Sequence, residues 1–108
     1  MEQGEPKIKV EYGTDVTLVT FTEEALFEEE QIKKLREFLE VVIEKNKDKK
    51  LILSFVNVRF TSSALLGLLV RVHKKVIELG GTLQLSNVDK SLRMVFEITQ
   101  LTKVFDIS

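Results

Sequence analysis

Three consecutive hydroxyl side chains, Thr61, Ser62 and Ser63, stand where a β-prone run gives way to a helical pattern. Such hydroxyls accept hydrogen bonds from the free N–H groups of the first helical turn, and Ser and Thr are preferred at capping positions. A serine or threonine hydroxyl can also be phosphorylated. At this position the helix dipole and the unsatisfied N–H groups would stabilise the added phosphoryl group. Capping is the simpler interpretation, and the residues alone leave both open.

Nucleophilic catalysis by Ser62 lacks a base. The one histidine is His73, eleven residues further on, which is about 16 Å along a helix against the ~3 Å that a general base requires. No glycine-flanked nucleophile elbow is present, and Gly80-Gly81 follows a helical pattern, whereas a phosphate-binding glycine loop precedes one. The acidic pair at 23–24 has no converging third group. We therefore expect no enzymatic activity.

The composition argues against several further classes of function. Sixteen basic against seventeen acidic residues leave a net charge of -1, whereas nucleic-acid binding needs an excess of basic charge. Zero cysteines and one histidine argue against disulfides and zinc sites, so we expect no metal and no cofactor. The longest apolar run, 64–70, is too short to cross a bilayer, and the start MEQGEP lacks a signal-peptide core. We expect a cytoplasmic protein that binds neither nucleic acid nor membrane.

The strands and helices around these three hydroxyls determine where they lie. Alternating or β-prone runs predict strands at 8–12, 16–21, 51–56, 82–86 and 104–107. Helical spacing predicts helices over 28–47, 62–79 and 88–96. The order ββαβαβαβ indicates an α/β fold, with a mixed β-sheet and helices packed mainly on one face. We expect one domain over 7–108, after a flexible leader at 1–6.

The helix predicted over 62–79 carries more apolar surface than one packed face requires. Six side chains are expected to face the sheet: Leu65, Leu68, Leu69, Val72, Val76 and Leu79. A further stripe of Leu66, Val70 and Ile77 widens the apolar arc to about twice the ~100° needed for packing on one surface. Either a neighbouring helix of the chain covers this stripe, or it forms a partner surface that begins at the hydroxyl cluster.

Four features follow one another between Leu51 and Ile107. They are the strand at 51–56, the turn at 61–65, the break at 80–81 and a closing segment that ends in Val104-Phe105. In this order and spacing they resemble the STAS domain, a family named from sulfate transporters and anti-sigma factor antagonists. In that family a central strand runs into an Asp-Ser-Ser/Thr-Gly-Leu-like turn and a long helix. Before Leu51, the predicted hairpin and first helix follow the same order of strands and helix as in that family.

The resemblance implies a small, non-enzymatic regulator. Stand-alone bacterial members bind a serine-kinase anti-sigma factor, and phosphorylation by that kinase, reversed by a phosphatase, inactivates them. Carried over by position, the phosphorylated residue is Ser62, with Thr61 and Ser63 as alternative acceptors. Thr61 stands where the family usually has aspartate, and Ala64 where glycine is common. Loss of that aspartate removes a negative charge beside the acceptor, so kinase recognition can differ.

The expected partners are a serine-kinase anti-sigma factor-like protein and a phosphatase. We expect the kinase contact to involve six residues: Arg59, Thr61, Ser62, Ser63, Leu66 and Val70. Two alternatives stay open. The missing aspartate is compatible with a constitutive interaction module that has no phosphorylation switch. Because isolated STAS domains can also bind ligands, a sensor of a small molecule or nucleotide is the second alternative.

Overall fold

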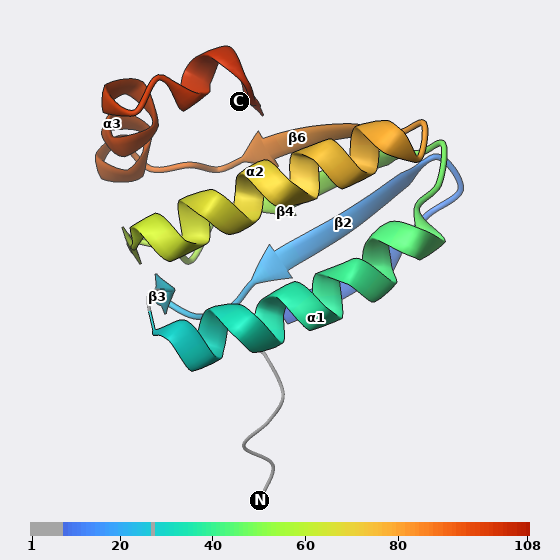
Figure 1. Cartoon of the computed structure of the whole chain (residues 1–108), viewed down its shortest axis with the longest axis horizontal. Helices are drawn as coiled ribbons and strands as arrows, with labels where there is room; N and C mark the ends of the chain where they lie inside the picture. The colour runs from blue at the N-terminus through green and yellow to red at the C-terminus, as the bar shows by residue number, and fades with distance from the viewer. Residues whose placement is uncertain (1–7, 27) are drawn as a thin grey trace, which may run out of the picture.

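The computed structural model describes residues 8–26 and 28–108, so the expected leader at 1–6 lies outside the described residues. A mixed sheet of five strands has the order β1-β2-β4-β6-β7. Its strands are β1 (Ile8–Tyr12), β2 (Val16–Phe21), β4 (Lys50–Ser54), β6 (Thr82–Ser86) and β7 (Asp106–Ile107). The helices are α1 (Glu29–Lys45), α2 (Ser63–Glu78) and α3 (Lys90–Ile98). Figure 1 shows α1 and α2 side by side across one face of the sheet, which confirms the predicted α/β fold.

The strand pairing follows from the connections between strands. β1 and β2 form an antiparallel hairpin, and β2–β4, β4–β6 and β6–β7 are parallel pairs. Parallel neighbours need a crossover, and α1, α2 and α3 lie in the three crossover connections. Along β2 the side chains of Thr17, Val19 and Phe21 are buried while those between them are half-buried or exposed. This alternation is typical of a sheet that is covered on one face.

The core lies between that face and the two long helices. On α2, Leu65, Leu68, Leu69, Val72 and Val76 are buried as predicted, whereas Leu79, at the C-cap, is half-buried. On α1 the buried residues are Ile32, Leu35, Leu39, Val42 and Ile43. Phe38, predicted on the same face, is 40% exposed because it lies on the flank of the helix. No helix of the described ranges is long and apolar enough to cross a membrane.

Two strand predictions were wrong in detail, and one small sheet was missed. β4 ends at Ser54 rather than at residue 56, because the chain turns to bury Phe55 against Phe21, with ring centroids 4.9 Å apart. The final strand covers only 106–107 and follows a 3₁₀ helix, η1 (Leu101–Lys103). A second sheet of β3 (Ala25–Leu26) and β5 (Phe60–Thr61) was not predicted. Two-residue strands carry no alternation from which a strand can be recognised.

A glycine cap ends α2, as the Gly80-Gly81 pair predicted. Gly80 has a φ of 84°, in the left-handed region. Its N–H donates to the carbonyl of Ile77 at 3.0 Å, and the Gly81 N–H donates to that of Val76 at 3.0 Å. These two bonds are the Schellman motif, and they satisfy carbonyls that the helix end leaves free.

The same substitution is expected to have opposite effects at two glycines. Gly67 lies within α2, and a Cβ there would meet nothing within 4 Å. Gly67→Ala therefore stabilises the fold by about 0.5 to 1 kcal/mol, through helix propensity. Gly80→Ala destabilises it by about 1 kcal/mol or more, because alanine resists positive φ and its Cβ would collide with the Asp48 side chain. Urea denaturation measures the free energy of unfolding of each variant. A change of the same sign in both would contradict the different roles given to Gly67 and Gly80.

Candidate functional site

Two buried side chains fix the loop that leads from β4 to α2. Phe55 is fully buried and Val58 is 1% exposed. Between them, the Asn57 Nδ2 donates to the carbonyl oxygen of Phe21 at 3.0 Å, which ties the loop to the end of β2. The start of α2 is therefore held at the carboxyl end of the parallel strands.

The small second sheet positions the next three residues. The backbone N–H groups of Arg59 and Phe60 both donate to the carbonyl of Glu24, at 2.8 and 3.1 Å. β5 then pairs with β3 in parallel, with Thr61 opposite residue 26. The Arg59 Nε lies 3.8 Å from the Glu24 Oε2, and both side chains are about two-thirds exposed. An ion pair so exposed contributes little to stability, so the backbone bonds fix this segment.

Ser62 is the N-cap residue of α2. Its backbone is extended, with φ of -139° and ψ of 170°, and its Oγ accepts a hydrogen bond from the Leu65 N–H at 3.4 Å. Its carbonyl accepts from the N–H groups of Leu65 and Leu66 at 3.1 and 3.2 Å. The capping interpretation of this serine is thus confirmed. Ser62 is half-buried, so part of this residue is accessible to solvent.

The neighbouring hydroxyls differ in exposure. Thr61 is half-buried and its Oγ1 donates weakly to the carbonyl of Ser62 at 3.5 Å. Ser63, the first residue of α2, is exposed. Two apolar side chains between β4 and α2 are also exposed, Val56 at 59% and Phe60, in β5, at 55%. The sequence analysis did not single them out, although both are large apolar residues close in sequence to the hydroxyl cluster.

The additional apolar stripe on α2 is partly covered. Leu66 and Val70 are half-buried and pack against the core, while Ile77 is 50% exposed. Next to them, His73 stacks edge-on against Phe105 at 5.8 Å between ring centroids. The C-terminal segment, rather than a neighbouring long helix, therefore lies against this flank. Leu66 and Val70 keep some accessible surface beside Ser62.

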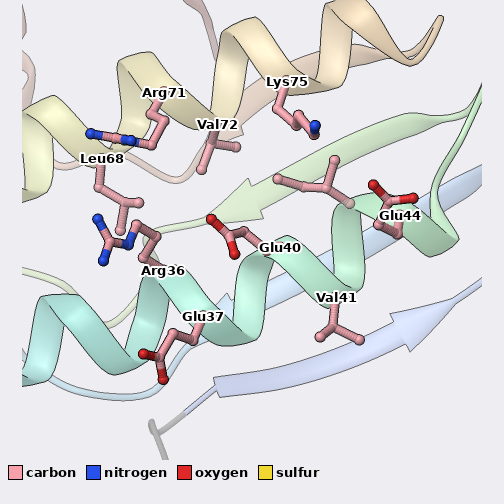
Figure 2. Close-up of a pocket in the computed structure, with 10 residues that line it drawn as sticks. Arg36, Glu37, Glu40, Val41, Glu44, Leu68, Arg71, Val72 and Lys75 are labelled. Atoms are coloured by element: carbon pink, nitrogen blue, oxygen red, sulfur yellow. The ribbon is translucent and has the colours of Figure 1, made fainter.

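A groove of about 540 Å³ runs between α1 and α2 on the outer surface. Its charged lining is balanced in sign, as Figure 2 shows: Arg36, Arg71 and Lys75 against Glu37, Glu40 and Glu44. A second hollow of about 440 Å³ shares part of this lining and extends to Ala64 and Gly67, near the start of α2. A balanced lining does not favour an anionic ligand such as a nucleotide. Nowhere in the described part of the chain do three or more acidic or histidine side chains gather to hold a metal.

The comparison with known families agrees with this architecture. A model of the STAS domain matches residues 7–108. The chain belongs to the STAS domain family. Among curated protein sequences, none is similar enough to match.

Solved structures of other STAS proteins share the fold. An anti-sigma factor antagonist domain from Planctomyces limnophilus has a TM-score of 0.83 at 22% identity, over 95% of this chain and 89% of that one. The anti-sigma factor antagonist SpoIIAA, in its unphosphorylated form, has a TM-score of 0.76 at 18% identity, over 94% and 87%. SpoIIAA from Bacillus in its phosphorylated form has a TM-score of 0.69 at 18% identity, over 94% and 90%.

The fold also occurs within a larger protein. The murine anion transporter Slc26a9 matches with a TM-score of 0.69 at 16% identity, over 82% of this chain but only 14% of the transporter chain. At these identities the likeness shows the fold alone.

Two substitutions separate the capping role of Ser62 from its other roles. Ser62→Ala removes the acceptor for the Leu65 N–H, and we expect a loss of about 0.5 to 1 kcal/mol in the free energy of unfolding. Ser62→Asp is expected to stay within about 0.5 kcal/mol of the wild type, because aspartate caps as well as serine and its charge suits the helix dipole. Chemical denaturation checks both values. A large destabilisation by Ser62→Asp would contradict the accessible geometry of the hydroxyl.

Proposed function

We propose that this STAS domain is an anti-sigma factor antagonist-like module that binds a serine-kinase anti-sigma factor. Phosphorylation of Ser62 by that kinase abolishes binding, and a phosphatase restores it. The observation that carries the proposal is the half-buried Ser62 at the N-cap of α2, on the same helix as the partly accessible Leu66 and Val70. Such a module acts in the cytoplasm, where the kinase and its ATP are found.

The electrostatics of the helix start suit a phosphoryl group. The γ-phosphoryl group of ATP forms a bond to the Ser62 Oγ as its bond to ADP breaks, ADP leaves and the hydroxyl proton is released. The added group carries roughly -1.5 to -2 charge at pH 7. The free N–H groups of the first turn and the helix dipole stabilise that charge, and the first turn of α2 carries no acidic side chain to oppose it. The fold therefore tolerates the modification.

The same charge opposes docking of a partner. Leu66 and Val70 lie one and two turns further along α2, and Phe60 is exposed just before it. A partner that buries this apolar surface would also have to remove water from the phosphate, which is costly without a dedicated cationic site. Phosphorylation thus changes binding without unfolding the domain.

The similarity to SpoIIAA supports this proposal. SpoIIAA is an anti-sigma factor antagonist whose structure is known in an unphosphorylated and a phosphorylated form. Here Thr61 replaces the usual aspartate, and its hydroxyl donates to the Ser62 carbonyl. Ser62 therefore lacks an adjacent negative charge, and Arg59, with its exposed side chain, is the charged group of the loop that a kinase would contact.

Incubation with a candidate kinase and ATP, followed by intact-mass spectrometry, tests the modification. We expect one added phosphate on the wild type and none on Ser62→Ala. Thr61→Ala and Ser63→Ala are the matched controls, and both should still be phosphorylated. If Ser62→Ala gains the phosphate while Thr61→Ala or Ser63→Ala does not, the acceptor is the neighbouring hydroxyl and the assignment to Ser62 is wrong.

A charge at Ser62 should weaken partner binding. We expect Ser62→Asp to reduce the affinity for the kinase-type partner ten-fold or more, measured by isothermal titration calorimetry. Ser91→Asp is the matched control, because Ser91 is an exposed serine in the first turn of a different helix, α3. Unchanged affinity of Ser62→Asp would favour a constitutive interaction module in place of the switch.

A further inference from the structure

Within the described residues, the outer edge of strand β1 pairs with no other strand. β1 is the outermost strand on its side among the described residues. The Gly13 N–H donates to the carbonyl of Val16 at 2.8 Å in the hairpin, and this bond fixes which residue pairs of the β1–β2 ladder are hydrogen-bonded. Because hydrogen-bonded and non-hydrogen-bonded pairs alternate, Lys9 and Glu11 direct their backbone groups toward β2. Ile8, Val10 and Tyr12 direct theirs outward, away from the sheet.

We infer that this edge pairs with the β1 edge of a second copy of the chain, in an antiparallel arrangement centred on Val10. In that register Val10 faces Val10 of the second copy, and Ile8 faces its Tyr12. These are the residues with outward backbone groups, so each pair can exchange N–H···O=C bonds. The two sheets then form one continuous sheet across a two-fold axis.

The charges on β1 complement themselves in this register. Lys9 and Glu11 are exposed side chains on the same face of the strand. Pairing about Val10 places Lys9 opposite Glu11 of the second copy, and Glu11 opposite its Lys9. Both are non-hydrogen-bonded positions, where facing side chains approach most closely. Two opposite-charge pairs therefore flank the axis, which favours a second copy over an unrelated strand.

Apolar side chains accompany the free edge on the helix face. Tyr12 is 49% exposed, and the Lys45 Nζ of α1 lies 5.6 Å from the centre of its ring, so one flank of α1 lies over β1. Phe38, two turns before Lys45 on the same flank, is 40% exposed. A second copy would cover Tyr12 and Phe38.

The strand lacks two of the features that protect an edge. Soluble proteins protect exposed edge strands with prolines, bulges or charged side chains, lysine above all. β1 pairs continuously with β2 over five residue pairs and contains no proline, and its two charges, Lys9 and Glu11, are opposite in sign, so they attract a second copy in this register. This dimer would leave the start of α2 free. α1 lies between β1 and α2, and α2 contacts β6, which is three strands away from β1 in the same sheet.

Sedimentation velocity over a concentration series of the full chain tests the inference. We expect a monomer–dimer equilibrium that stops at the dimer, because a two-fold interface closes on itself. Lys9→Glu alone and Glu11→Lys alone should each weaken dimerisation about ten-fold or more, because two attractive pairs become repulsive. A mixture of the two variants should regain association as a mixed dimer, and the variant with both changes should dimerise like the wild type.

The controls separate this edge from other surfaces. Lys74→Glu reverses an exposed charge on α2 and should leave dimerisation unchanged, and circular dichroism shows that each variant is folded. A wild type that stays monomeric at every concentration would overturn the inference. So would a dimer whose dissociation constant is unaffected by both single reversals, or oligomers larger than a dimer.

Discussion

Both ends of α2 are held to the sheet, and the geometry of the site depends on this constraint. At its start, Phe55 and Val58 are buried and the second sheet holds the last residues before Ser62. At its end, the chain reverses through Gly80, and Gly81 passes so close to the carbonyl of Lys49 that no side chain would fit. Because a helix is rigid between its ends, these contacts also fix which residues of α2 face outward. The position of the Ser62 hydroxyl is thus a consequence of core packing at a distance from it.

In the proposed function, one oxygen atom has two roles. The Ser62 Oγ caps the helix through a single long hydrogen bond of 3.4 Å, and such a bond contributes about 1 kcal/mol at most to a fold whose total stability is typically several times larger. Modification of that oxygen therefore leaves the packed core, and with it the fold, in place. The surface next to it is affected far more, since a doubly charged group must stay hydrated. A cap that contributes little to stability is well suited to a switch of binding.

The parts of the fold that follow from periodicity could be predicted from the sequence. The hairpin, the two long helices, the glycine stop and the capping role of Ser62 each rest on patterns within a few residues. The second sheet could not be predicted, because β3 and β5 pair two residues each across a gap in sequence of more than thirty. The contact of His73 on α2 with Phe105 was also beyond reach, because it depends on where the C-terminal segment returns. The groove likewise exists only once α1 and α2 are packed together.

Because the helices cover one face of the sheet, the two flanks of α1 have different environments. One flank faces α2 across the groove, where Glu40 and Glu44 are set against Arg71 and Lys75. The other flank lies over β1, where Lys45 contacts the ring of Tyr12 and Phe38 is partly exposed. The free backbone groups of β1 and the N-cap serine at the start of α2 therefore lie in separate regions of the surface. Since α1 separates the two regions, the proposed association of two chains at β1 and the proposed docking of a partner at Ser62 do not compete for surface.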